Sequence, residues 1–182
     1  GLINDAEHTA ANLEALHGYL NDGDFEQRQE AFGAVKQGVA LVVRAGAVPF
    51  RFIAPAGHPL GALESVRVED LSGVDFVGFV DSTMSGRAFD RLFATMRDPP
   101  VQKMKSYLSH IVSALVLRGI GVGIVDAFTA EDHARMGGIV RPLEIAERFE
   151  YSIIKPHGEK LSAEALSLVE TFEEHVTTYR DA

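Results

Sequence analysis

The segment Lys105–Phe128 constrains the fold most, because it holds a helix start, a helix end and a buried strand in immediate succession. Ser109 is predicted to be an N-cap, since its hydroxyl can accept a hydrogen bond from an unpaired helical N–H group. Arg118 suits the last helical turn, and Gly119 suits the left-handed residue that follows it. The run Gly121–Asp126 has the length and apolar character of a parallel strand covered on both faces. The segment therefore predicts a βαβ unit of an open α/β domain.

A second strand-turn-helix unit lies upstream. Phe76–Val80 is predicted to be a short buried strand, and the hydroxyl-rich turn at residues 81–86 leads into a helix. At the carboxyl end of a strand, N–H groups and hydroxyls of such a turn can face a ligand. Ser82, Thr83 and Ser85 are the candidate ligand contacts. One of them is expected to be the N-cap, and whether a further one contacts a ligand stays open.

Three other polar residues start helices. Ser109 lies at a helix N-terminus, which is a favourable position for an anion. His110 follows it and is expected to be neutral, because an imidazolium would be repelled by the helix N-terminus. For His110 a structural role and a ligand contact both stay open. Asp126 is predicted to be the N-cap of a short helix ending near Arg135, with a ligand contact as the alternative.

The remaining chain contributes scaffold elements. Residues 1–37 are predicted to form two acidic amphipathic helices, and residues 38–56 two extended segments interrupted by Pro49. His58 is interpreted as a turn residue held by local hydrogen bonds. Ser162 is predicted to cap the last helix. The buried face of that helix is expected to comprise Leu161, Ala165, Leu168, Val169, Phe172 and Val176.

Composition and charge exclude several classes of protein. The formal net charge of −9 argues against a nucleic-acid surface on this chain. Residues 35–143 carry twelve bases and ten acids, whereas both flanks are acidic, so an anion site is expected in the middle. The sequence has no cysteine, no signal-peptide pattern and no apolar run long enough to span a bilayer, which suits a cytoplasmic protein. His8 and His17 lack organised companions, so we expect neither a metal site nor a cofactor.

Several motifs carry a family resemblance. The segment SHIVSALVLRGIGVGIVD, the motif P-x-G-H-P-L at residues 55–60, V-x-x-x-D-L at residues 66–71 and the strand at residues 139–143 resemble the effector-binding domain of LysR-type transcriptional regulators. Within that family, Leu108–His110 and Ile124–Asp126 most resemble the regulators of octopine and nopaline catabolism.

The resemblance implies an α/β fold with lobes of the type 2 periplasmic-binding-protein kind. It implies a partial first lobe from residues 38–57 and 147–182 and a second lobe at residues 58–146, whereas residues 1–37 are predicted to be a helical segment. The family's first lobe opens with alternating strands and helices, which residues 1–37 do not show. The expected partners are a small carboxylate or amino-acid-derived effector between the lobes, a second copy in a homodimer or higher oligomer, and DNA through a winged helix-turn-helix missing from this chain.

Other classes of function stay open. No nucleophile is paired with a base at a recognisable spacing and no phosphate-binding G-x-x-x-x-G-K-[ST] is present, so we expect a sensor and not an enzyme. A solute-binding protein of the periplasmic type, a dimerisation module and an enzyme of small-carboxylate metabolism are the alternatives. Turnover of a candidate ligand would reveal the enzyme.

Overall fold

The computed structural model of the protein describes residues 40–156 and 160–180. These residues belong to two compact units, one containing residues up to 46 together with 150–175, the other containing residues 47–149 and those from 176 on. In chain order the elements are β1 (Ala40–Ala54), the 3-10 helices η1 (Pro59–Ala62) and η2 (Val68–Leu71), β2 (Asp75–Phe79), α3 (Met84–Ala94), β3 (Val101–Ser106), α4 (Ser109–Leu117), β4 (Val122–Asp126), α5 (Ala127–Arg135), β5 (Ile139–Pro142), β6 (Arg148–Pro156) and α6 (Ala163–Arg180). The two helices predicted within residues 1–37, with His8 and His17, lie outside the described residues.

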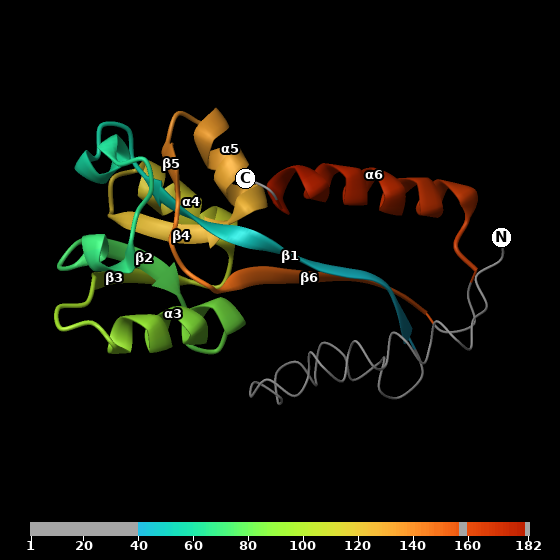
Figure 1. The fold of residues 1–182 in the computed structure, drawn as a ribbon, viewed down its shortest axis with the longest axis horizontal. Coiled ribbons are helices and arrows are strands. Elements are labelled where there is room, and N and C mark those ends of the chain that lie inside the picture. The colour runs from blue at the N-terminus through green and yellow to red at the C-terminus, as the bar shows by residue number, and fades with distance from the viewer. Residues whose placement is uncertain (1–39, 157–159, 181–182) are drawn as a thin grey trace. The chain divides into compact units, whose positions relative to one another are not determined.

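A mixed sheet forms the centre of the larger unit (Figure 1). Its strand order is β3-β2-β4-β1-β5, and β6 also pairs with β1. β2 is parallel to β3 and to β4, whereas β1 is antiparallel to β4 and β5. The chain steps outward from β2 to β3 and then back past β2 to β4. Parallel crossovers are right-handed in nearly all sheets, which places the helices of two crossovers that run in opposite directions on opposite faces. Figure 1 shows α3 on one side of the sheet with α4 and α5 on the other.

The core lies between these layers. Every residue of β4 is buried, which confirms the strand predicted from the apolar run at Gly121–Asp126. Phe50 on β1 meets Phe89 of α3 edge to face at 4.9 Å between ring centroids, and Phe76 of β2 meets Phe93 of α3 at 5.2 Å. These apolar contacts attach α3 to the sheet.

The predicted βαβ unit is present, with its turn chemistry at the helix end. Gly119 follows α4 with φ of 77°, a conformation that glycine adopts without a Cβ clash. Its N–H group donates to the carbonyl oxygen of Val116 at 2.8 Å, and that of Ile120 donates to Leu115 at 3.3 Å. These bonds satisfy the last carbonyl groups of the helix. The prediction of Gly119 as the left-handed residue is therefore confirmed.

Two predictions about the scaffold are wrong. β1 runs without a break from Ala40 to Ala54, so Pro49 does not divide it into two strands. β1 pairs with β4 and β5 through residues 50–54. Pro49, which has no N–H group to donate, lies just before this paired segment. Leu168 of α6 is 71% exposed, whereas Val176 is fully buried. Spacings of four and three residues join Ala165, Val169, Phe172 and Val176 into one stripe, and Leu168 lies to its side.

Candidate functional site

The carboxyl ends of β2 and β3 meet at one edge of the sheet. Phe79 and Ser106 are register partners, and beyond them the N–H group of Val80 donates to the carbonyl oxygen of Ser106 at 3.1 Å. The two strands lead into helices on opposite faces of the sheet. Open α/β sheets bind ligands outside the carboxyl ends of their strands. The edge therefore brings the turn after β2 and the turn after β3 side by side.

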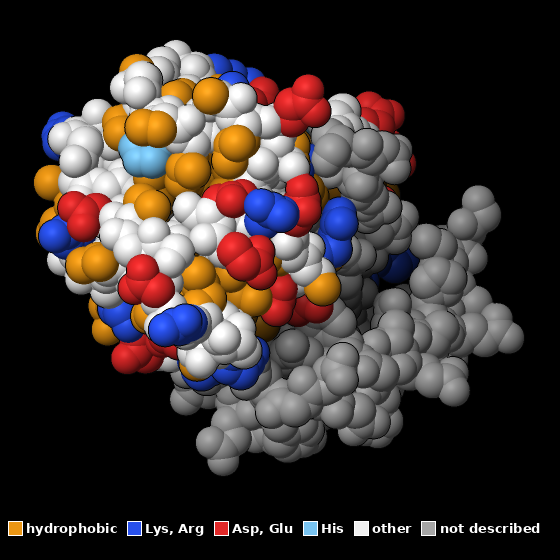
Figure 2. Space-filling model, turned by 60° about the vertical axis from the view of Figure 1, so that its left-hand side comes forward, with side chains coloured by type: hydrophobic (Ala, Val, Ile, Leu, Met, Phe, Trp, Pro, Cys, Tyr) orange, Lys and Arg blue, Asp and Glu red, His pale blue; other side chains and the backbone are white. Residues whose placement is uncertain are grey.

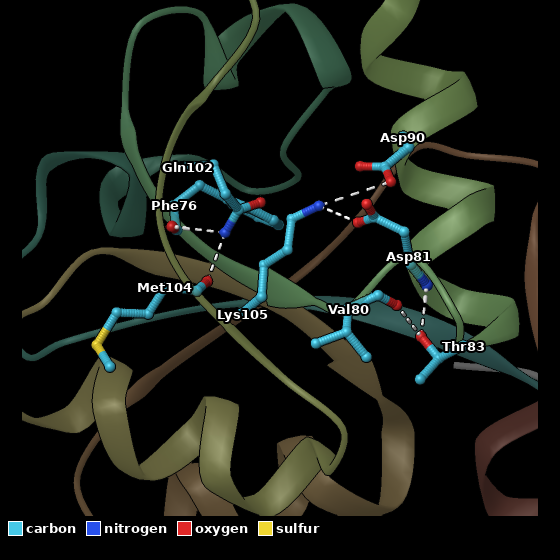
Figure 3. A network of polar contacts seen from close by, with 9 residues as sticks. Phe76, Val80, Asp81, Thr83, Asp90, Gln102, Met104 and Lys105 are labelled. Carbon is cyan, nitrogen blue, oxygen red and sulfur yellow. Dashed lines mark hydrogen bonds and ion pairs between the residues drawn. The ribbon is translucent and has the colours of Figure 1, made fainter.

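Thr83 is the N-cap of α3. Its hydroxyl accepts a hydrogen bond from the N–H group of Gly86 at 3.0 Å and donates to the carbonyl oxygen of Val80 at 2.8 Å (Figure 3). The hydroxyl is thus engaged in both roles. Gly86 is required at this point, because a Cβ atom there would stand 2.2 Å from the Val80 oxygen. The prediction that one residue of this turn caps the helix is confirmed, and that residue is Thr83.

Ser109 is not the N-cap of α4, contrary to the prediction. The helix begins at Ser109 itself, and Leu108, the residue in the N-cap position, makes no side-chain hydrogen bond. Ser106 explains the difference, because its hydroxyl accepts from the N–H group of Leu108 at 3.2 Å and shapes the turn before the helix. The carbonyl oxygen of Leu108 accepts from Ile111 and Val112, which leaves the first two N–H groups of α4 without an intrahelical partner.

Three predicted hydroxyls have no hydrogen-bond partner among the described residues: Ser82, Ser85 and Ser109. Ser82 is exposed, and Ser85 and Ser109 are half-buried. Ser82 lies in the turn after β2, and Ser85 and Ser109 lie in the first turns of α3 and α4, which follow the two strand ends that Val80 and Ser106 join. His110 is exposed at the second position of α4. The edge consequently presents uncommitted hydroxyls beside a helix N-terminus that lacks a side-chain cap.

Asp126 lies at the carboxyl end of β4, the strand on the other side of β2. It is 4% exposed, and its two carboxylate oxygens accept from the N–H group of Thr129 at 2.9 Å and from the Thr129 hydroxyl at 3.0 Å. The prediction of Asp126 as the N-cap of α5 is confirmed. A contact between Asp126 and a ligand stays a prediction.

Lys105 is a charged residue of this edge that the sequence reasoning missed. Its ammonium group contacts the carboxylate of Asp81 and lies 3.7 Å from that of Asp90 on α3 (Figure 3). The hydrogen bond between Lys105 and Asp81 lowers the pKa of Asp81 and raises the pKa of Lys105, so both groups are charged over a wide pH range. Lys105 reaches this edge because the strand register pairs it with Gly78, near the end of β2. The sequence alone does not show this pairing.

An irregularity in the strand pairing fixes how β3 approaches β2. Phe76 pairs with Gln102 but Val77 pairs with Met104, so Lys103 is an extra residue in β3. The side-chain amide of Gln102 donates to the carbonyl oxygens of Phe76 and Met104 (Figure 3). Because of this extra residue, Lys105 pairs with Gly78 and so lies near the carboxyl end of β2.

Other features of the described residues lie away from this edge. His58 caps η1 through Nδ1, which accepts from the N–H group of Leu60 at 3.3 Å, so its interpretation as a turn residue is confirmed. A hollow of about 450 Å³ lies between η2 and the end of α3, on the side where β2 begins. Within residues 40–156 and 160–180, no three His, Asp or Glu side chains are grouped to hold a metal ion. None of the described helices has the length and apolar character needed to cross a membrane.

An open sheet with helices on both faces, and parallel strands ending at hydroxyl-bearing turns, defines the class of α/β ligand-binding domains. Within that class, residues 39–177 match the family described as the LysR substrate binding domain, and the chain belongs to that family. Both the α/β fold class and the family resemblance predicted from the sequence are thereby confirmed.

Two relatives carry names of regulators. The chain is 28% identical over 124 residues to the transcriptional activator protein LysR of Escherichia coli (strain K12), covering 68% of this chain and 39% of that protein. It is also 28% identical over 102 residues to the regulatory protein NocR of Agrobacterium tumefaciens (strain T37), covering 56% of this chain and 34% of that protein. The chain thus spans less than half the length of these relatives.

Solved structures show the same fold. The regulatory domain of CcmR from Synechocystis PCC6803, in complex with 2-PG, matches with a TM-score of 0.57 and 12% identity over 93% of both chains. The effector binding domain of QuiR in complex with shikimate matches with a TM-score of 0.55 and 15% identity, covering 77% of this chain and 66% of that one. The BenM effector binding domain with its effector benzoate matches with a TM-score of 0.55 and 16% identity, covering 80% of this chain and 76% of that one.

Proposed function

We propose that this chain is the effector-sensing part of a transcriptional regulator, and that a small carboxylate or amino-acid derivative binds at the carboxyl edge of β2 and β3. The observation that carries the proposal is the group of uncommitted hydroxyls at Ser82, Ser85 and Ser109 beside the uncapped start of α4. Hydroxyls and helical N–H groups donate hydrogen bonds, so together they suit an anionic ligand group.

With Lys105 and Asp81, the proposed site can pair with an anionic or a cationic group of a ligand. The Lys105 ammonium group can pair with a ligand carboxylate, and the Asp81 carboxylate can pair with a ligand amine. Both side chains lie at the same edge and are already charged. An effector that carries both groups would exchange the internal ion pair for two pairs with the ligand. His110 and Asp126 complete the set of candidate contacts.

Effector binding is proposed to change the relative stability of two arrangements of the regulator. A ligand shifts such an equilibrium only by its difference in affinity for the two states. We propose that the regulator works in the cytoplasm as a homodimer or higher homo-oligomer, and that a DNA-binding segment of the longer protein reads the change. The names of the LysR and NocR relatives support this regulatory role and not a catalytic one.

A thermal-shift screen tests the proposal. The panel contains small carboxylates, including shikimate and benzoate, together with amino acids and their carboxylated derivatives. A compound that binds only the folded chain raises the melting temperature, by an amount that grows with its concentration relative to Kd. Failure of every anionic compound to raise it, while uncharged analogues do, would contradict an anion-binding edge. Conversion of a compound that binds would instead favour an enzyme.

A further inference from the structure

A buried histidine outside the proposed effector site joins three elements of the larger unit. His133 of α5 has no exposed surface. Its Nδ1 lies 2.9 Å from the hydroxyl oxygen of Ser113 on α4, and its Nε2 lies 3.0 Å from the carbonyl oxygen of Ala54 at the end of β1. One imidazole ring therefore links β1 to both helices on that face of the sheet.

These partners determine the protonation state of the ring. A carbonyl oxygen can only accept, so Nε2 must carry the proton that is donated to Ala54. In the neutral ring, Nδ1 then has a free lone pair and accepts the hydrogen of the Ser113 hydroxyl. Both ring nitrogens are satisfied in this one neutral tautomer.

The surroundings of the ring disfavour a charge. A Cβ atom at Gly138 would stand 2.1 Å from Nε2, so the turn before β5 closes over the ring. Burial lowers the pKa of His133, and the hydrogen bond to Ala54 partly opposes this. The packed elements carry these charged or titratable residues: Arg44 and Arg51 on β1, His110 on α4 and Arg118 directly after it, Asp126 at the start of α5, Glu131, Asp132 and Arg135 on α5, and Arg141 on β5.

We propose that the Ser113–His133–Ala54 bridge is a proton-sensitive clamp that holds the end of β1 against α4 and α5. Uptake of one proton from solvent places it on Nδ1 and turns that atom from an acceptor into a donor. The Ser113 hydroxyl must then rotate to accept, and the buried ring carries a positive charge without a counter-ion. The bridge then stabilises the contact of β1 with α4 and α5 less strongly.

The direction of the pH effect follows from linkage. The folded chain binds the His133 proton more weakly than the unfolded chain, whose pKa is close to 6.5. The stabilisation that the neutral His133 provides is therefore fully present above that value. It is lost as pH falls from there toward the pKa of the folded state, by up to about tenfold in the folding equilibrium constant per pH unit.

The test begins with the wild-type chain and needs no mutation. Imidazole NMR resonances are followed from about pH 8 to about pH 5, together with amide hydrogen exchange at the end of β1 and in α4. The expected result is an Nε2–H tautomer for His133, a transition below the ordinary histidine pKa of about 6.5, and weaker protection of these amides, relative to the intrinsic exchange rate at each pH, as the pH falls. A His133 transition at or above about 6.5, or an Nδ1–H tautomer, overturns the proposal.

Two matched variants give a second readout. His133→Gln removes the titration and retains an amide donor for Ala54, so its stability should fall less between about pH 7 and about pH 5 than that of the wild type. Thr83→Ala removes the cap of α3, on the other face of the sheet, and no group that titrates in this range, so it should lower stability but retain the wild-type slope. An unchanged slope in His133→Gln also overturns the proposal. If that variant does not fold, the wild-type titration still decides.

Discussion

Cap-forming side chains show how far single residues could be predicted. Thr83, Asp126 and Ser162 each accept a hydrogen bond from an N–H group two or three positions into their helix, as expected from the residue type. Ser109 has the same chemistry but not the same role, because Ser106 already shapes the turn and the helix begins one residue early. Residue type thus identified the helix starts, and the exact capping residue depended on the path of the turn.

This difference between Ser109 and Thr83 predicts that two similar mutations will differ in their cost to stability. Thr83→Ala should lower the free energy of unfolding by about 1 kcal/mol, because it removes the N-cap of α3. Ser109→Ala should change it by less than about 0.5 kcal/mol, since no described partner is lost. Denaturant unfolding of both variants measures this. Equal losses would mean that Ser109 also acts as a cap.

Strand burial could be predicted for β4 but not for β3. The continuous apolar run of β4 is typical of a central strand, and it is buried throughout. The residues of β3 include only two apolar side chains, Val101 and Met104, which lie three positions apart and not two, and residues 101–105 are all exposed. β3 is the outermost strand of the sheet, and the bulge at Lys103 changes its phase. Neither the edge position nor the bulge can be read from the local pattern.

Truncations in these two strands should therefore differ in cost. Ile124→Ala in β4 removes a fully buried side chain and should lower the free energy of unfolding by about 2–5 kcal/mol. Met104→Ala in β3 removes a side chain that is 44% exposed and should cost less than about 1 kcal/mol. Chemical denaturation of the two variants under identical conditions gives the comparison. A large loss for Met104→Ala would show that β3 is covered in solution, for instance by a second copy.

The strand order of the sheet depends on pairing between segments that are far apart in the sequence. The motifs predicted the family and the α/β class, but not that β1 lies between β4 and β5, nor that Lys105 reaches Asp81 and Asp90. The division into a partial first lobe at residues 38–57 and 147–182 and a second lobe at 58–146 stays a prediction.

The distribution of charge is also a property of the whole molecule. On the face shown in Figure 2, Lys and Arg side chains stand among Asp and Glu side chains and do not form one basic area.

The net charge predicts weak interaction of this chain with DNA. At a formal charge of −9 the chain is repelled by the phosphate backbone, and the mixed charges in Figure 2 offer no continuous basic track. A gel-shift titration with duplex DNA at moderate salt should show no complex. A sequence-specific complex that survives added salt would contradict the prediction that DNA is contacted only through another segment of the regulator.

The central claim is that an anionic effector binds at the carboxyl edge of β2 and β3, and calorimetric titration tests it most directly. The carboxylate that gives the largest thermal shift is titrated into the wild type, Ser109→Ala, Ser82→Ala and Ser72→Ala. Ser72 bonds to Asp98 before β2 begins, so it is a matched control at the opposite edge. Loss of a hydroxyl bonded to a charged ligand group should weaken binding about 10- to 100-fold in Ser109→Ala or Ser82→Ala and leave Ser72→Ala unchanged. Equal affinity in all four proteins would contradict the claim.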